Sequence, residues 1–484
     1  MEEYIDDIDD EWKPDPKVVD DLLSQELMKM TMQERNAIQE EIHGVHCLAP
    51  EETPEMLEKS LKNLAYELDH AVRPDKKKAY LKSQRFGETY VNQDDFRLRF
   101  LRCELFDVSK AADRMVLFLD SVQDLFGDYA LQRSIRLSDF TRDEQKYMRR
   151  GRYQFLPFRD RSGRRILVSF PGKELETIPP RVKSKIALYF AWTGGNDVNT
   201  QKLGIVALVW FDKAFEVSSR PTKLHLKFHE VATVRATSIH LCTPDTPFYH
   251  FRRSVLTMRI GHNRSKLRVH LGNTMELYYI LQSYGIPTDT IPITYSGTVK
   301  VAPSRQWMRL RQYLEEPYYQ ESGESASIIE CPYLNDIVFR QGTNACSHPG
   351  NASFRAMIAA RYQEFWLSNS TIRNHKNNTR IFIEGVMDEI EKSRARVLNW
   401  NDKQGCWKVL TDASQIYIKI EYLVRELRAT NRARLNQQIH NSSTSLFCSN
   451  GGSNSRQFTK GQILSASEKS KGCFKGCFDT DSDT

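Results

Sequence analysis

Hydrophobic positions in residues 94–127 predict two consecutive amphipathic helices with a break at Phe106-Asp107. Behind the break, apolar residues recur at steps of three and four positions and form one stripe on one helix face: Val108, Ala112, Met115, Leu119, Val122 and Phe126. Asp107 is a suitable N-cap for the second helix, and Gly127 is a suitable end. The stretch therefore predicts a helical hairpin.

Residues 16–150 as a whole are predicted to form a helical N-terminal region. Further helical patterns occupy about 16–45 and 54–72, and each has enough apolar residues to dock on another element. Residues 1–15 are acidic and polar, and we expect this arm to be disordered.

From residue 153 onward, short apolar runs alternate with helical patterns. Strands are predicted at 164–170, 204–215, 236–243 and 267–271. Helices are predicted at 181–192, 224–234, 247–260 and 273–284. The second run, GIVALVWFDKAF, is nearly unbroken and typical of a central strand covered on both faces. This alternation predicts an α/β domain with a mainly parallel sheet over residues 151–302.

After a linker at 303–332, residues 333–430 predict a small α+β domain. His348-Pro349-Gly350 is typical of a turn, and Asn351 is a suitable N-cap for a first helix. Later patterns predict a second helix, a hairpin and a last helix at 379–394, 397–409 and 412–429. Residues 431–484 are rich in Ser, Asn and Gly and are predicted to be disordered.

Composition places this chain of 484 residues, 40% of them hydrophobic, among globular proteins with two or three domains. Its nine cysteines contain no CxxC pair, and we see neither a signal peptide nor a membrane-spanning run. We therefore expect reduced thiols and a cytoplasmic protein. Peripheral membrane attachment and a nuclear location are left open.

The net charge of +7 hides a strong segregation. Residues 1–73 carry seven basic and 20 acidic residues, a balance of −13, whereas residues 74–300 carry 38 and 23, a balance of +15. Residues 333–440 carry a balance of +6. We expect the acidic segment to be a solvated tail, and the alternative is that it shields the basic body.

Signatures of catalysis are absent from the sequence. We find no GxGxxG, GxxxxGK[ST] or GxSxG motif and no arranged nucleophile, base and orienting group. His225 and His229 share a helix face but lack further metal ligands nearby. We predict no enzyme activity, no catalytic residue, no metal and no cofactor.

Three short phrases in the first hairpin resemble the CRAL-TRIO (Sec14-like) lipid-binding family: Phe100-Leu101-Arg102, Phe106-Asp107-Val108 and Lys110-Ala111. The order of helices and strands over about 94–300 is also similar to that family. The resemblance implies a lipid cavity in the α/β domain, with the helix at 247–260 as a mobile gate. Two features depart from the family, because residues 286–297 replace its closing LPxxxGG phrase and no headgroup positions can be aligned.

This resemblance assigns the cavity and its gate to seven apolar residues: Phe248, Phe251, Val255, Leu256, Met258, Phe190 and Trp210. It assigns Arg252, Arg253 and Arg259 to a headgroup or a membrane surface. The alternative is that these residues form ordinary core with a solvated basic edge.

The opening of the C-terminal domain is similar to a domain of unknown function that recurs in diatom proteins and contains an HPGN motif. The matching residues are Asp336, Arg340, Gly342, Asn344, His348, Pro349, Gly350, Asn351, Phe354 and Arg355. The loop could hold a phosphate or another anion at a helix N-terminus. Alternatively, it is a turn that ties a strand to a helix, with His348 hydrogen-bonded structurally.

The first functional hypothesis is non-enzymatic binding or transfer of a hydrophobic ligand, such as a phospholipid, with transient contact to a membrane surface. The alternative is a regulatory adaptor that binds nucleic acid or a protein partner through residues 333–430. The oligomeric state is left open.

Overall fold

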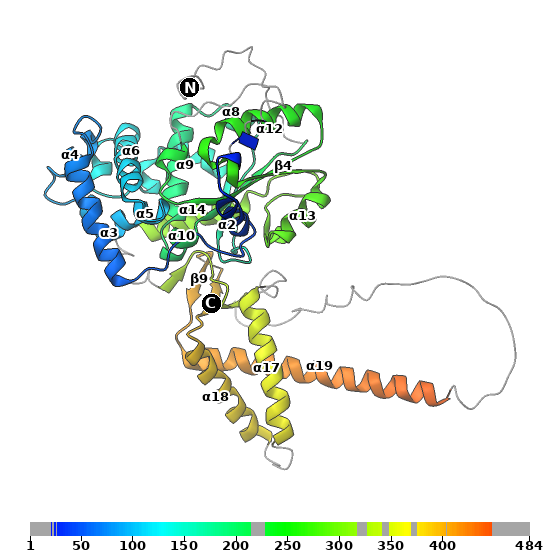
Figure 1. Cartoon of the computed structure of the whole chain (residues 1–484). Helices are drawn as coiled ribbons and strands as arrows, with labels where there is room; N and C mark the ends of the chain where they lie inside the picture. The colour runs from blue at the N-terminus through cyan, green and yellow to red at the C-terminus, as the bar shows by residue number, and fades with distance from the viewer. Residues whose placement is uncertain are drawn as a thin grey trace. The chain divides into compact units, whose positions relative to one another are not determined.

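The structure is a computed structural model that describes most of the chain. The described residues are 21, 24–25, 27–213, 228–316, 327–340, 348–368, 375–402 and 404–447. The chain divides into two compact units, Met1–Ser325 and Ala326–Thr484, which are described separately (Figure 1). Both mix helices and strands, and helices predominate.

The N-terminal part of the first unit is helical, as predicted. Its α-helices are α2 (Met32–Ile42), α3 (Pro54–Tyr66), α4 (Lys78–Ser83), α5 (Asp94–Cys103), α6 (Val108–Phe126) and α7 (Arg142–Arg149). Short 3-10 or π turns are η1 (Glu67–Ala71), η2 (Tyr90–Asn92), η3 (Asp128–Leu131) and η4 (Leu137–Asp139).

The predicted hairpin is confirmed as α5 and α6. Leu105 and Phe106 take φ values of 52° and 66°, which breaks the helix between them. The Asp107 carboxylate accepts a hydrogen bond from the Lys110 N–H at 3.2 Å, and Gly127 ends α6 with φ 96°. The apolar stripe of α6 is buried against α3, α5 and α9 (Pro180–Gly194), except at the half-buried Val108.

A five-stranded, mostly parallel sheet forms the centre of the first unit. Its strands are β1 (Tyr153–Phe155), β2 (Arg165–Ser169), β3 (Ile205–Trp210), β4 (Ala236–Thr243) and β5 (Leu267–Leu271). They lie in sequence order, with β1 antiparallel to β2 and the other pairs parallel. The remaining elements are α8 (Lys173–Glu176), α10 (Val198–Leu203), α11 (Phe228–Val231), α12 (Pro247–Arg259), η5 (Gly261–Lys266), α13 (Thr274–Ser283), η6 (Thr288–Thr290) and α14 (Ala302–Glu315).

The two faces of this sheet are covered by different helices, which Figure 1 draws on either side of β4. Right-handed crossovers between neighbouring parallel strands place their connecting helices on one face. The described part of these connections includes α9 and α12. We call the face of the sheet that these helices cover the α12 face. The helix after β5 packs on the opposite face, which we call the α13 face.

The described part of the acidic N-terminal segment docks on the sheet, so the predicted solvated tail is wrong for it. The Glu41 carboxylate at the end of α2 forms a two-pronged ion pair with Arg235 at 2.6 and 2.7 Å, and both side chains are buried. Glu52 pairs with Arg102 at 2.8 Å in a second buried contact. Buried arginines need such partners, because an unpaired buried charge is strongly unfavourable. Residues 1–20 lie outside the described residues.

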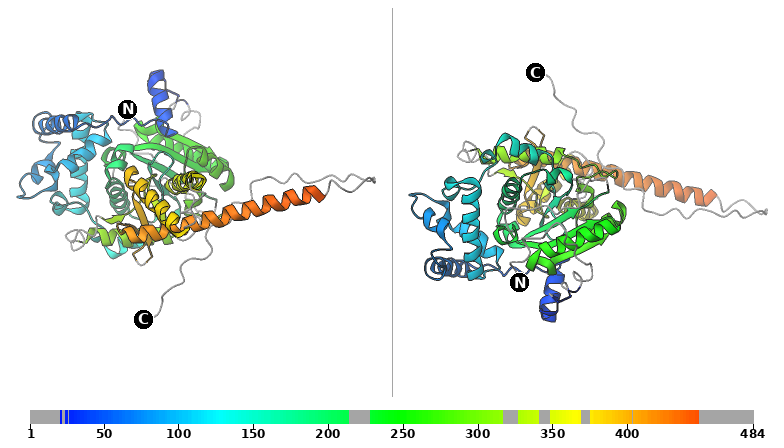
Figure 2. Two further views of the ribbon diagram at one scale, coloured as in Figure 1. Left: turned by 90° about the horizontal axis from the view of Figure 1, so that it is seen from below. Right: turned by 90° about the horizontal axis from the view of Figure 1, so that it is seen from above.

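The second unit combines a small mixed sheet with three helices. Its elements are β6 (Ile328–Ile329), β7 (Ile337–Phe339), α17 (Pro349–Ser368), α18 (His375–Ser393), β8 (Val397–Asn401), β9 (Cys406–Val409) and α19 (Ala413–Phe447). The strand order is β6-β9-β8-β7, with β7 parallel to β8. The predicted hairpin is confirmed as β8 and β9. The last helix runs well beyond its predicted end at 429, as the views in Figure 2 show.

Candidate functional site

Two rows of side chains cross the α12 face of the sheet. Parallel pairing aligns Leu167 with Ala207, Ala207 with Ile239, and Ile239 with Leu267. The next row along the strands is Ser169, Val209, Leu241 and Val269. Because paired residues in a parallel sheet point to the same side, these rows form one surface across four strands that is apolar except at Ser169.

This apolar surface is incompletely covered. Leu167, Ala207, Val209, Ile239 and Val269 are only half-buried. On the other side of β3, the alternating residues Val206, Leu208 and Trp210 are completely buried, with exposed fractions of 0, 1 and 0%. Central parallel strands normally have both faces covered. Partial exposure of apolar side chains here therefore marks the α12 face as a candidate ligand surface.

The start of α12 anchors this helix to the sheet. The Tyr249 ring lies 5.8 Å from the ring of Phe211, and its hydroxyl donates a hydrogen bond to the Asp212 carbonyl at 2.9 Å. Tyr249 is 6% exposed and belongs to the same apolar cluster as Leu241 and Leu267. The helix is thus held over the β4 and β5 part of the α12 face.

Most predicted gate side chains lie outside the described part of the structure. This is the case for Phe251, Val255, Leu256, Met258, Arg252 and Arg259. Phe248 is described and is 40% exposed, with its ring 5.2 Å from that of Tyr249. Arg253 is half-buried.

The two other predicted cavity residues lie apart from each other. Phe190 on α9 stacks on Trp307 of α14 at 4.8 Å and is 2% exposed, so it belongs to the packed helical core. Trp210 points to the α13 face, where its ring lies 5.6 Å from that of Tyr278. Neither Phe190 nor Trp210 belongs to the two rows of side chains on the α12 face.

A buried hydroxyl on the α12 face, that of Thr243, makes no hydrogen bond within the described part of the chain. Thr243 follows Ile239 and Leu241 at alternate positions of β4, so it points to the same side. A buried hydroxyl without a partner is unfavourable, so the position suits a ligand that supplies a polar atom.

The sheet residues of this face were not predicted as site residues. The alternation of apolar positions in the strands was visible in the sequence. It does not reveal which side remains partly uncovered, because that depends on the helices packed above it.

The α13 face carries a histidine pair instead. His240 Nδ1 lies 2.9 Å from His270 Nε2, and both rings contact Tyr284 at 4.6 and 5.4 Å. Burial, assisted by Arg268, lowers the pKa of His270 to about 4, and burial also lowers the pKa of His240. Both rings are therefore neutral at pH 7. Among the described residues, no three His, Cys, Asp or Glu side chains gather as metal ligands, and His225 lies outside them.

In the second unit, Asp336 holds the segment before β7. Its carboxylate forms two hydrogen bonds with Arg396 at 2.9 and 2.6 Å and accepts another from the Tyr333 N–H at 2.6 Å. Asp336 is 1% exposed, and the Arg396 guanidinium lies 4.3 Å from the Tyr333 ring centroid. The carboxylate is thus fully used by the protein.

The HPGN residues connect strand β7 to the start of helix α17. Asn351 accepts a hydrogen bond from the Val338 N–H at 2.8 Å and donates one to the Val338 carbonyl at 2.7 Å. A side chain on Gly350 would meet the Asp336 carbonyl oxygen at 2.0 Å, so glycine is required. Burial lowers the pKa of His348 to about 4, although the neighbouring Asp336 acts to raise it. These contacts agree with the structural interpretation of the motif.

Asn351 is not the N-cap that the sequence suggested. Helix α17 begins earlier, at Pro349, because proline is well suited to the first helical turn. The Asn351 amide instead pairs with the β7 backbone, as described above. We call Asp336, His348, Gly350 and Asn351 together the HPGN staple.

The remaining motif residues also serve packing where they are described. Phe354 is buried in the core of the unit, and the Arg340 guanidinium lies 3.8 Å from the Trp400 ring centroid. Arg355 is half-buried. Gly342 and Asn344 lie outside the described residues.

No protein-family model matches this chain, and no curated protein matches it either. The two family resemblances therefore stay predictions. No helix in the described part of the chain combines the length and apolar character needed to cross a bilayer.

Proposed function

We propose that the first unit binds a hydrophobic ligand, such as the acyl part of a lipid, on the α12 face of its sheet. The observation that supports this most is the half-burial of Leu167, Ala207, Val209, Ile239 and Val269 in a mostly parallel sheet. These side chains would gain burial from an apolar ligand, and each square ångström of apolar surface removed from water contributes about 25 cal/mol.

The proposal agrees with the Sec14-like resemblance, which expects a cavity over this sheet and a gate at α12. Under this proposal α12 is the movable cover, and Thr243 is a polar contact for the ligand. A binding protein of this kind needs no catalytic group, and its contact with a membrane would be transient.

The first experiment asks whether the full chain carries a ligand. Native mass spectrometry of the purified protein, before and after delipidation, should show loss of a bound hydrophobic molecule. The delipidated protein should then move a fluorescent phospholipid between vesicles. A folded protein that neither copurifies with such a molecule nor transfers the probe contradicts the proposal.

Ala207→Leu tests the location of the site. On an incompletely filled surface the larger side chain occupies ligand space, so transfer should fall at least tenfold while the free energy of unfolding changes little. The matched control is Ala413→Leu, the same change at an exposed position of α19. If Ala207→Leu instead destabilises the protein by about 1–3 kcal/mol and leaves transfer unchanged, the α12 face is ordinary core.

The alternative function, an adaptor acting through residues 333–430, stays a prediction. The described members of the HPGN staple are occupied by contacts within the unit. Nothing in that geometry favours a nucleic acid or a protein partner over the structural interpretation.

A further inference from the structure

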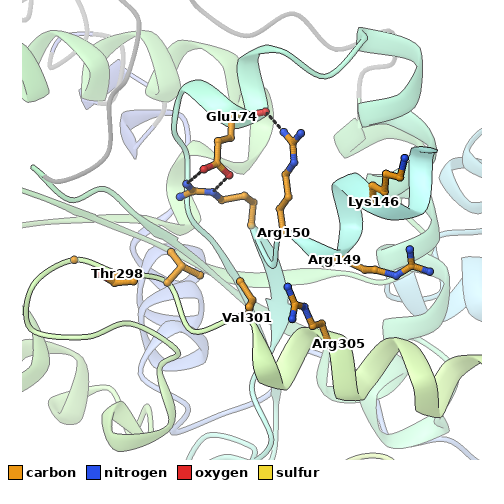
Figure 3. Close-up of a pocket in the computed structure, with 10 residues that line it drawn as sticks. Lys146, Arg149, Arg150, Glu174, Thr298, Val301 and Arg305 are labelled. Atoms are coloured by element: carbon orange, nitrogen blue, oxygen red, sulfur yellow. Dashed lines mark hydrogen bonds and ion pairs between the residues drawn. The ribbon is translucent and has the colours of Figure 1, made fainter. Parts of the chain in front are cut away.

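A strongly basic pocket lies in the first unit, away from the rows of the α12 face. Five of its ten lining residues are cations: Lys146, Arg149, Arg150, Arg152 and Arg305. They come from the end of α7, the segment before β1 and the first turns of α14, and Figure 3 labels all of them except Arg152. The cavity volume is about 510 Å³, which is the size of a small-molecule site.

The single carboxylate of the pocket is already used. Glu174 Oε1 and Oε2 each lie 3.2 Å from the guanidinium of Arg152, so the two side chains form a two-pronged pair. Arg150 donates a hydrogen bond to the main-chain carbonyl of Glu174 at 3.4 Å. Glu174 therefore neutralises one of the five cations. Lys146 is also paired, with Asp143 at 2.8 Å, so three of the five remain without an ion pair among the described residues.

Within the described residues, two of these three cations make no bond at all to an acidic residue, whereas Arg150 contacts the Glu174 backbone. Arg149 bonds only to the neutral Gln145 side chain at 3.0 Å, and no ion pair involves Arg305. Both side chains are exposed. Their guanidinium groups are thus available to a ligand.

The basic surface continues along α14. A second hollow of about 370 Å³ shares Arg149 and Arg305 with the first and adds Arg309. Arg305 and Arg309 are one helical turn apart, where like charges repel each other. The next arginine on this helix, Arg311, is instead paired with Glu315 at 2.7 Å. The pocket side of α14 thus concentrates positive charge that an anion would stabilise.

We propose that this pocket binds a small anion that carries two or more phosphate groups. Arginine forks match phosphate oxygens in paired hydrogen bonds, and these charge-assisted bonds are stronger than neutral ones. The hydroxyl-bearing Thr298 also lines the hollow and can donate to a phosphate oxygen. Several unneutralised cations in one hollow favour an anion with more than one charged group over a single carboxylate.

The experiment uses the full chain and two defined probes. Isothermal titration calorimetry with inositol hexakisphosphate should give saturable binding, and inorganic phosphate should bind far more weakly. Arg149→Gln combined with Arg305→Gln should weaken the affinity about 10- to 100-fold, since two charged hydrogen-bond donors are lost. The matched control, Lys78→Gln with Arg85→Gln, removes two exposed charges outside the pocket and should change the affinity less than about twofold.

A second arm distinguishes a free anion from a lipid headgroup. Vesicles of phosphatidylcholine, with and without a bisphosphorylated phosphoinositide, are tested for co-sedimentation with the same variants. Binding to the phosphoinositide vesicles that is lost in the Arg149/Arg305 variant identifies the lipid source. Binding to the soluble probe alone identifies a free anion, and either result supports the proposal.

Three outcomes overturn it. The first is that neither probe binds, and the second is that the Arg149/Arg305 variant binds as tightly as the control variant. The third is that a single-stranded oligonucleotide binds through Arg149 and Arg305 more tightly than either small probe, because the pocket then serves a nucleic acid. Failure of phospholipid transfer does not bear on this pocket, since its residues lie outside the α12 face.

Discussion

The α12 face and the HPGN staple differ in how completely their polar and apolar groups are used. In the staple, the Asp336 carboxylate and the Asn351 amide are both hydrogen-bonded to other groups of the same unit. On the α12 face, apolar side chains such as Ala207 and Val209 are half-buried, and the Thr243 hydroxyl makes no hydrogen bond within the described residues.

This difference indicates that a recognisable sequence motif need not be a binding site. The HPGN residues stand out in the sequence because their geometry is demanding, and that geometry serves the fold. The α12 face carries no recognisable sequence motif, yet several of its apolar side chains are only half-buried. The comparison predicts that substitutions in the staple reduce stability, whereas substitutions on the α12 face mainly affect ligand binding.

The largest expected effect comes from a matched pair of leucines on the two faces of the sheet. Leu208→Ala on the fully buried α13 face should lower the free energy of unfolding by about 4 kcal/mol, because it leaves a cavity in a closed core. Leu167→Ala on the α12 face should cost only about 1–2 kcal/mol, since Leu167 is half-buried. Urea denaturation measures both, and equal losses would show that the faces are equally packed.

The second expected effect lies in the staple. Gly350→Ala should lower the stability of the second unit by about 3 kcal/mol, because the new methyl group would overlap the Asp336 carbonyl oxygen. Gly385→Ala is the control within the same unit: it has open space in α18 and should raise stability by about 0.5–1 kcal/mol. Hydrogen exchange of β7 and α17 peptides measures both changes. Phospholipid transfer should be unchanged, and its loss in Gly350→Ala would contradict a purely structural role.

Local pattern was sufficient to predict many elements of the fold. The Asp107 cap and the helix break before it depend on neighbouring residues, although the break falls at Leu105-Phe106, one residue earlier than predicted. The alternation of strands and helices likewise predicted a mainly parallel sheet, because parallel strands need such crossovers.

Contacts between distant residues could not be predicted in this way. Glu41 and Arg235 are 194 positions apart, so charge counts alone suggested a solvated tail. The unbroken apolar run of β3 did not reveal that Trp210 points to the α13 face. The RRGR run at 149–152 was visible as local basic charge, but only the fold brings Arg305 beside it.

The third prediction uses acid to compare the staple with the sheet. His348 and His270 both have a pKa of about 4 in the folded chain, against 6.5 in the unfolded chain, because burial favours the neutral ring. The unfolded chain therefore takes up protons below pH 6.5, while the folded chain does so only near pH 4. Stability should fall across this window, by about 2 kcal/mol for each histidine between pH 7 and pH 5.

Substitution separates the two histidines from carboxylates that titrate in the same range. His348→Gln should reduce the acid sensitivity of hydrogen exchange in β7 and α17, and His270→Gln should do so in β4 and β5. A variant whose local exchange keeps the full pH dependence of the wild-type chain would show that its histidine does not cause the effect.

The smallest expected effect concerns the unpartnered hydroxyl of Thr243. Thr243→Val keeps the shape of the side chain and removes a buried hydroxyl without a partner, so the ligand-free protein should gain about 1 kcal/mol. Thr237→Val is the control in the same strand, because its hydroxyl donates to the Ile205 carbonyl at 3.0 Å and its loss should cost about 1 kcal/mol. Thermal unfolding of the delipidated variants measures whether each substitution raises or lowers stability.

The effect of Thr243→Val on ligand uptake shows whether the Thr243 hydroxyl contacts the ligand on the α12 face. If this hydroxyl contacts a polar atom of the bound molecule, Thr243→Val should weaken lipid uptake several-fold although it stabilises the empty protein. Thr237→Val should leave uptake unchanged. A Thr243→Val protein that is more stable and binds the probe normally would restrict the α12 face to apolar contacts with its ligand. A loss of stability equal to that of Thr237→Val would show instead that the Thr243 hydroxyl is satisfied, and the contrast with the HPGN staple would then rest on the half-buried apolar rows alone.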